Sequence, residues 1–162
     1  MEELFKNYKD KNILLEKIKE FPDLNFQDKN KQTILMHALL YCKDKDILLE
    51  ILKQKPKLNI QDNYGYTITM HAFKYCKYKD VLLEILKQNP DLTLKNYYYK
   101  TALDIALENY IPNHEFNVLE KLYNENCKQD KQLFNKDYIK LRNKYKIVPL
   151  IMFRQQKRNN KS

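Results

Sequence analysis

The fold is decided by residues 58–91, which read LNIQDNYGYTITMHAFKYCKYKDVLLEILKQNPD. The preceding stretch, residues 24–57, reads LNFQDKNKQTILMHALLYCKDKDILLEILKQKPK and is identical at 22 of 34 positions. Self-similarity at a fixed period is typical of repeat proteins, in which each unit buries its apolar face against its neighbours. The sequence therefore predicts a stack of similar units rather than one irregular core.

The period of 34 residues extends beyond these two copies in both directions. Residues 13–16 continue it upstream, and Thr101 and Ala106 continue it downstream. At Val118 the match arrives three residues late, so we expect an insertion near residues 111–114. We predict units at about residues 1–27, 28–61, 62–95 and 96–126.

Each unit is predicted to contain two short helices. In the third unit Thr67 is placed to cap the first helix, because its side chain accepts hydrogen bonds from N–H groups at a helix start. We expect Asp80 to cap the second helix in the same way. Pro90 ends this helix, because the residue before a proline disfavours the α conformation. The apolar residues between cap and proline fall on one stripe, Val81, Leu82, Ile85 and Leu86.

Ten residues separate that proline from the threonine of the next unit, too many for a tight helix–helix turn. In the third unit this connection ends in DNYGYT, residues 62–67, and the following helix contains MHA, residues 70–72. In the fourth unit residues 101–106 read TALDIA. These motifs resemble the D-x-x-G-x-T loop and the T-P-L-H-x-A helix start of ankyrin repeats, whereas tetratricopeptide repeats of the same period have two longer helices and short turns. The resemblance covers roughly residues 4–126 and implies an all-α ankyrin-repeat solenoid with projecting hairpin loops.

The chain departs from the ankyrin pattern at positions where glycine is usual. The hairpin glycine is present as Gly65 and is replaced by Lys31 and Tyr99 in the neighbouring units. The glycine that ends the second helix is replaced by Lys55 and Asn89. A side chain in the left-handed region costs on the order of 1 kcal/mol. We therefore expect lower stability than in an idealised array, unless these loops adopt another turn.

Composition excludes several classes of protein. A chain of 162 residues with one glycine cannot form P-loops or dinucleotide-binding loops, which need several glycines. The apolar run at residues 147–153 is interrupted by Pro149 and is shorter than the roughly 20 residues of a membrane-spanning helix. Residues 1–6 are acidic where a secretory signal is basic, so we expect a cytosolic protein. A reducing compartment also suits the three cysteines, which form no C-x-x-C pair, Cys42, Cys76 and Cys127.

The formal charge of +9 belongs entirely to the last 36 residues. Residues 1–126 contain 19 Lys and 19 acidic residues, whereas residues 127–162 contain 11 Lys or Arg and 2 Asp. Apolar spacing near residues 131–147 predicts a helix that caps the last unit, followed by a mobile tail at residues 154–162. The alternative for this basic end is docking on nucleic acid, anionic lipid or an acidic partner.

We find no residue set that predicts catalysis, a cofactor or a metal site. His37 and His71 occupy equivalent positions, so stacking holds them too far apart to share a metal, and we predict buried, hydrogen-bonded imidazoles. Cys42 and Cys76 are likewise too far apart for a disulfide. Residues 114–118 begin like the H-E-x-x-H motif of zinc proteases but end in Val. No nucleophile is paired with a base at a spacing typical of enzymes.

Aromatic residues on the polar connections are the best candidates for a binding function. Tyr64, Tyr66 and a run of three tyrosines at residues 97–99 lie where no core is expected, and tyrosine combines contact area with a hydrogen-bonding end. The alternative is a compositional bias, because the chain has 13 Tyr. In ankyrin arrays the hairpin tips and the first helices line a concave surface. The resemblance assigns this surface to Asn30, Gln32, Leu40, Tyr41, Tyr64, Tyr66, Lys74, Tyr75, Tyr98, Lys100, Glu108 and Asn109.

We therefore expect a monomeric, non-enzymatic module that binds another protein on its concave face. A second hypothesis is a module that binds nucleic acid or an anionic membrane through residues 127–162, with the repeats as a rigid spacer. Deleting residues 148–162 separates them, because only the second predicts loss of salt-dependent binding. Delivery into a host cell as an effector is compatible with such an array, although the sequence carries no signal for it.

Overall fold

The computed structural model describes residues 2–7, 10–109, 118, 121, 122, 124, 125 and 129. The described residues form seven helices and no β-strand, which agrees with the predicted all-α class. The predicted insertion, capping helix and tail lie outside the described residues. The helices are α1 (Glu2–Asn7), α2 (Lys11–Lys19), α3 (Ile34–Tyr41), α4 (Lys45–Lys53), α5 (Ile68–Tyr75), α6 (Lys79–Lys87) and α7 (Ala102–Asn109).

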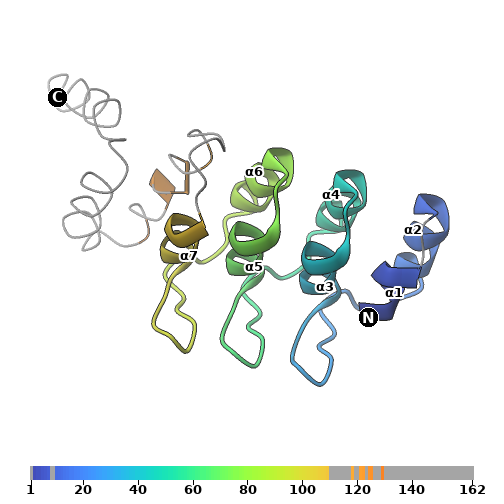
Figure 1. Ribbon diagram of the computed structural model, residues 1–162, viewed down its shortest axis with the longest axis horizontal. Helices are drawn as coiled ribbons and strands as arrows, with labels where there is room; N and C mark the ends of the chain where they lie inside the picture. The colour runs from blue at the N-terminus through green and yellow to red at the C-terminus, as the bar shows by residue number, and fades with distance from the viewer. Residues whose placement is uncertain are drawn as a thin grey trace, which may run out of the picture.

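The helices stack side by side in two rows (Figure 1). Helices α1, α3, α5 and α7 form the row of first helices, and α2, α4 and α6 form the row of second helices. Helix α3 packs against α1 and α5, α5 packs against α7, and α4 packs against α6. Three loops project from the same side of the stack, below α3, α5 and α7. The described part of the chain is thus a short helical solenoid, as predicted.

The core of the described residues consists of two buried clusters, each built by more than one unit. Leu48 of α4 and Ile85 of α6 belong to one buried cluster, and Ile105 of α7 and Leu122 belong to a second cluster at the far end. Full burial of such a side chain contributes about 1.5–3 kcal/mol. The predicted stripe of α6 faces this core, although Leu82 is only half-buried.

Thr67 caps α5 as predicted, whereas the predicted cap of α6 is absent. Thr67 Oγ1 accepts a hydrogen bond from the N–H of Met70 at 3.3 Å. The prediction that Asp80 caps α6 is wrong, because the helix begins at Lys79 and Asp80 lies in its first turn. The cap position is occupied by Tyr78, whose side chain makes no capping hydrogen bond. In α4 the equivalent position is Asp44, which does cap its helix.

Each projecting loop is closed by a single polar side chain. Oδ1 of Asp62 accepts hydrogen bonds from the N–H groups of Tyr64 and Tyr66, both at 2.9 Å. Asp28 and, with an amide oxygen, Asn96 make the same pair of bonds in the other two loops. This local bonding is the reason why Asp and Asn are favoured in turns. We call the three loops the hairpins and number them in chain order, residues 28–32, 62–66 and 96–100.

Hydrogen bonds tie successive hairpins into a common edge. The N–H of Tyr97 donates to the carbonyl of Tyr64 at 3.0 Å. Nε2 of Gln61 donates to the carbonyl of Gly65 within its own unit at 2.7 Å and to that of Lys95 in the next at 3.0 Å. The same two kinds of bond join the first hairpin to the second. The stretches before the three threonines therefore align along the stack, as the repeat requires.

Side chains occupy the left-handed backbone positions where ankyrin repeats have glycine. Lys31 and Tyr99 have φ values of 55° and 59°, close to the 77° of Gly65. Lys55 and Asn89, after the second helices, have φ values of 53° and 51°. The loops thus keep the turn that glycine favours, and the predicted conformational cost of the substitutions is present.

Candidate functional site

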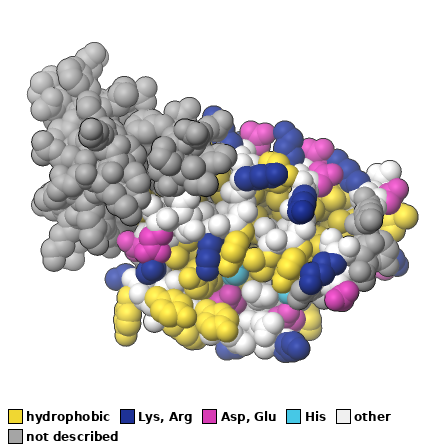
Figure 2. All heavy atoms as spheres, in the orientation of Figure 1, with side chains coloured by type: hydrophobic (Ala, Val, Ile, Leu, Met, Phe, Trp, Pro, Cys, Tyr) yellow, Lys and Arg dark blue, Asp and Glu magenta, His cyan; other side chains and the backbone are white. Residues whose placement is uncertain are grey.

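The hairpins together with α3, α5 and α7 form one face of the molecule, which we call the hairpin face. None of the twelve predicted contact residues is buried. Figure 2 shows large hydrophobic side chains gathered at the lower left of the molecule, over the later hairpins, with lysines near them. The exposed members are Asn30, Tyr64, Lys74, Tyr75, Tyr98, Glu108 and Asn109, and the partly exposed ones are Gln32, Leu40, Tyr41, Tyr66 and Lys100.

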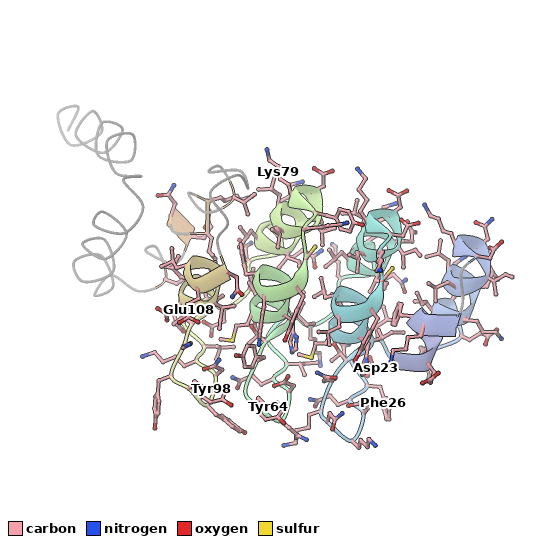
Figure 3. The ribbon with its side chains drawn as sticks, in the orientation of Figure 1. Asp23, Phe26, Tyr64, Lys79, Tyr98 and Glu108 are labelled. Atoms are coloured by element: carbon pink, nitrogen blue, oxygen red, sulfur yellow. The ribbon has the colours of Figure 1, made fainter. Side chains whose placement is uncertain are left out.

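Aromatic exposure increases from the first hairpin to the third. The first hairpin has no aromatic residue, and the second presents Tyr64, which is 62% exposed. The third presents Tyr97, Tyr98 and Tyr99, which are 69%, 61% and 84% exposed. Figure 3 shows Tyr64 and Tyr98 at the tips of their loops. The predicted contact set left out Tyr97 and Tyr99, although their place beside Tyr98 was the signal that could have included them.

Lys74 lies over two tyrosine rings in the middle unit of the hairpin face. Its Nζ is 4.8 Å from the ring centroid of Tyr66 and 5.1 Å from that of Tyr75. Both distances are in the range of cation–π attraction. Tyr75 raises the pKa of the Lys74 ammonium, partial burial lowers it, and the net direction is upward. The ammonium therefore stays charged at neutral pH.

A histidine–aspartate pair recurs in two units, and it is fully buried in the third unit and partly buried in the second. Nε2 of His71 is 2.9 Å from Oδ2 of Asp62, and Nε2 of His37 is 2.9 Å from Oδ2 of Asp28. His71 also stacks on Tyr75, with ring centroids 5.8 Å apart. Both imidazoles are buried, as predicted, but the prediction of full hydrogen bonding holds for Nε2 only. Nδ1 of each ring is buried and has no hydrogen-bond partner among the described residues.

Asp62 connects its hairpin to α5. Burial raises the pKa of its carboxyl, whereas hydrogen bonds from His71 and from the N–H groups of Tyr66 and Tyr64 lower it. The lowering effects prevail, so Asp62 is ionised at neutral pH. One carboxylate oxygen closes the hairpin and the other holds His71 of the helix.

The fourth unit replaces both members of this pair. Asn96 stands in the place of Asp62, and Ile105 stands in the place of His71. Oδ1 of Asn96 keeps the hairpin bonds, while its Nδ2 is buried without a partner among the described residues. The joint replacement was a signal in the sequence that the aspartate and the histidine act together, and sequence reasoning missed it.

The sequence also matches a known family over most of the described part of the chain. A family model described as ankyrin repeats (3 copies) matches residues 5–96. The chain belongs to the ankyrin-repeat family. No curated protein matches the chain. Ankyrin repeats are generally protein–protein interaction modules, and the family is typically non-enzymatic.

The ankyrin stack continues beyond the matched residues. Helix α7 packs on α5, and Leu122 is completely buried in the core that these helices share. The side-chain amide of Gln129 donates to the carbonyl of Pro90 at 3.0 Å and accepts from the N–H of Leu92 at 2.7 Å. Gln129 is the one described residue of the basic segment 127–162, so the polyanion-binding hypothesis concerns residues outside the described part.

The described part of this ankyrin array contains no group of three or more His, Cys, Asp or Glu side chains placed to bind a metal ion. Cys42 and Cys76 are free thiols, and burial raises the pKa of both, which makes them weak nucleophiles at neutral pH. His114 and Cys127 lie outside the described residues. No helix in the described ranges has the length and apolar character needed to cross a membrane.

Proposed function

We propose that this ankyrin array binds a partner protein on the hairpin face, without catalysing a reaction and without a cofactor. The observation that carries the proposal is the exposure of Tyr64 and of the tyrosines at 97–99, which lies between 61% and 84%. Tyrosine rings usually obtain their stabilisation from burial in a core or an interface. At the loop tips they add nothing to the core, so contact with a partner accounts for them.

Tyr99 supports the proposal through its backbone. It is 84% exposed and has a φ of 59°, so it combines a conformational cost of about 1 kcal/mol with almost no burial in return. Strained side-chain-bearing residues of this kind concentrate at functional surfaces. A partner that covers Tyr99 would supply the burial that the isolated chain lacks.

The hairpins are held rigidly enough to serve as a binding surface. Asp28, Asp62 and Asn96 close the three loops, and the bonds of Gln61 and Tyr97 tie the second hairpin to the third. A surface that is ordered before binding loses less conformational entropy when the partner arrives. The hairpin face is therefore better suited to specific contact than flexible loops of the same composition.

The test uses the full chain with the double substitution Tyr64→Ala/Tyr98→Ala. Partners captured by the wild type are purified, and their Kd values are measured for both proteins by calorimetry. We expect binding to weaken at least about tenfold, because truncation of a central interface tyrosine commonly costs 1 kcal/mol or more. The control is Ile13→Ala, which removes an exposed apolar side chain from α2 in the other row of helices. Equal Kd values for wild type and double variant would refute the hairpin face.

We also propose that the chain acts as a monomer in a reducing compartment such as the cytosol. The free thiols of Cys42 and Cys76 suit such a compartment. Light scattering after size-exclusion chromatography tests the oligomeric state, and a mass twice that of the chain would contradict it.

A further inference from the structure

The carboxylates of the hairpin face have hydrogen-bonding partners within the protein, whereas most of its lysines form no ion pair with a described residue. Every carboxylate of the hairpins and of α3, α5 and α7 already has a hydrogen-bonding partner within the described residues. By contrast, Lys29, Lys31 and Lys74 form no ion pair with a described residue, and Lys100 is the one lysine of these elements that does. On this face, therefore, lysines rather than carboxylates are available to form an ion pair with a partner. The engaged carboxylates are Asp28 with His37, Asp62 with His71, Asp104 with Thr101 and Glu108 with Lys100.

Lys74 differs from Lys29 and Lys31 in its contacts with two tyrosine rings. Two rings, those of Tyr66 and Tyr75, lie 4.8 Å and 5.1 Å from its Nζ and hold the ammonium in place. A lysine whose side chain is already positioned loses less entropy when it binds a carboxylate than an unrestrained one. The ring of His71 contacts both of these rings, with its centroid 5.6 Å from that of Tyr66 and 5.8 Å from that of Tyr75.

The fourth unit shows what fits at these positions. Lys100 is the equivalent of Tyr66, and Glu108 is the equivalent of Lys74. The two side chains form an ion pair at 2.8 Å, so the same place on the face accommodates an ammonium and a carboxylate together. In the third unit the ammonium is present and the described residues supply no carboxylate to it.

We infer that the partner presents an acidic protein segment, one carboxylate of which binds Lys74 between Tyr66 and Tyr75. This inference rests on the proposed function and names the chemistry of the partner for that face. Nucleic acid is disfavoured on the hairpin face because residues 1–126 contain 19 Lys and 19 acidic residues, so the repeats carry no net charge, and because they contain no Arg, the residue best shaped for bidentate contact with phosphate.

The second unit, which precedes that of Lys74, indicates how far apart the acidic residue and an apolar residue of the bound segment should lie. Leu40 of α3 occupies the position of Lys74 and is half-buried beside Tyr41. Packed helices lie about 8–10 Å apart, and an extended chain advances about 3.3 Å per residue. A segment that crosses from α5 to α3 therefore places an apolar residue three positions from its acidic residue.

The experiment selects binders from a library of random peptides of about twelve residues displayed on phage, with the full chain as bait. Affinities of labelled peptides are then measured by fluorescence anisotropy for the wild type and for Lys74→Met. The matched control is Lys87→Met, which removes an ammonium that is 63% exposed on α6 and paired with Glu84. This control also accounts for non-specific attraction by the basic residues 127–162, which both variants retain.

We expect enrichment of Asp or Glu with an apolar residue three positions away. Lys74→Met should weaken these peptides about fivefold, the effect of losing one partly exposed charge pair, and Lys87→Met should not. Replacing the acidic residue of the peptide by its amide should weaken binding to the wild type equally and leave binding to Lys74→Met unchanged.

Peptides without acidic enrichment that are weakened by Tyr64→Ala/Tyr98→Ala would overturn the inference and leave the proposed function standing. Peptides indifferent to Tyr64→Ala/Tyr98→Ala, or a library without binders, would count against both. A single-stranded oligothymidine that binds the wild type and loses more affinity with Lys74→Met than the peptides do would also overturn it, in favour of nucleic acid.

Discussion

At the residue scale, Gly65 and Lys31 occupy the same left-handed position of successive hairpins, but we expect substitutions at the two sites to have opposite effects on stability. A Cβ on Gly65 would lie 2.9 Å from Cδ1 of Tyr97 and 3.0 Å from Cα of Asn96, in addition to the strain at a φ of 77°. We predict that Gly65→Ala lowers the free energy of unfolding by about 2 kcal/mol. The reciprocal change Lys31→Gly should raise it by about 0.5 kcal/mol, because relief of strain exceeds the added entropy of the unfolded chain.

Urea denaturation of the two variants checks this pair of predictions. Lys29→Gly is the control for Lys31→Gly, since residue 29 is not among the positive-φ positions and glycine there should destabilise the fold. A loss of stability in both Gly65→Ala and Lys31→Gly would show that the left-handed turn is not what separates the two sites.

Because Asp62 is held in its ionised form by hydrogen bonds, including that of His71, we expect the stability of the chain to fall at low pH. The pKa of Asp62 is lowered below its ordinary value of 3.8 in the folded chain, so its ionised form stabilises the fold above that value. This stabilisation is lost as the pH falls through the lower, folded-state pKa. We predict that the free energy of unfolding decreases below about pH 4, and that Asp62→Asn reduces the decrease.

Urea titrations at several pH values between roughly 3 and 7 measure how the free energy of unfolding changes with pH. Asp62→Asn can keep both hairpin bonds, as Asn96 does in the fourth unit. The double variant Asp62→Asn/His71→Ile copies the fourth unit, so at neutral pH it should lose less stability than the sum of its single changes. Identical acid slopes for wild type and Asp62→Asn would refute the assignment.

At the element scale, helix capping and surface ion pairs stabilise the second helices unequally. Asp44 caps α4 by accepting from the N–H of Asp46 at 2.8 Å. Asp46 itself pairs with Lys11 of the preceding unit at 2.7 Å, with side chains 57% and 40% exposed. We predict that Asp44→Ala destabilises the chain by about 1 kcal/mol and that Asp46→Ala costs less, because exposed ion pairs contribute little.

Thermal and urea unfolding of the two alanine variants check this order. Both changes remove one carboxylate from the same turn, so each serves as the control for the other. A larger effect for Asp46→Ala would mean that the ion pairs between second helices, which recur between Lys45 and Asp80, hold the units together more strongly than the caps do.

At the scale of the whole molecule, each unit depends on its immediate neighbours. Gln61 bridges the second and third hairpins, and among the described residues no equivalent bond spans more than one junction. Stability in a stack of this kind is approximately a sum of units and nearest-neighbour interfaces. We predict that Gln61→Ala lowers the hydrogen-exchange protection of the Tyr97 amide, which bonds across that junction, and leaves amides within α4 unchanged.

Hydrogen exchange followed by nuclear magnetic resonance measures this local effect. Gln54→Ala, at an exposed glutamine after α4, is the control. An equal loss of protection throughout the chain would show that the stack unfolds as one unit and that the junctions are not separable.

The sequence predicted the features that follow from local spacing. The period, the two helices of each of the first three units, the cap by Thr67 and the burial of His37 and His71 were anticipated, because they follow from the repeat and from residues a few positions apart. The fourth unit is described only as far as α7 and a few later residues. The cap assigned to Asp80 failed, since the first residue of α6 lies one position before it and capping is sensitive to such a shift. The aspartate partner of each histidine was also missed, because the two residues are nine positions apart and meet only when the finished hairpin folds back onto the helix.

By itself, the amino-acid order determined a row of stacked helix pairs with loops on one side. Each repeat carries the same apolar stripe, and it can bury this stripe only by packing against the neighbouring repeats. Only the tertiary structure decided which polar groups are used inside the molecule and which remain available to a partner. Asp62 is turned inward onto His71, while Lys74 is held outward between two rings. Both outcomes depend on side chains from different elements meeting within a few ångströms, and spacing along the chain does not encode such distances.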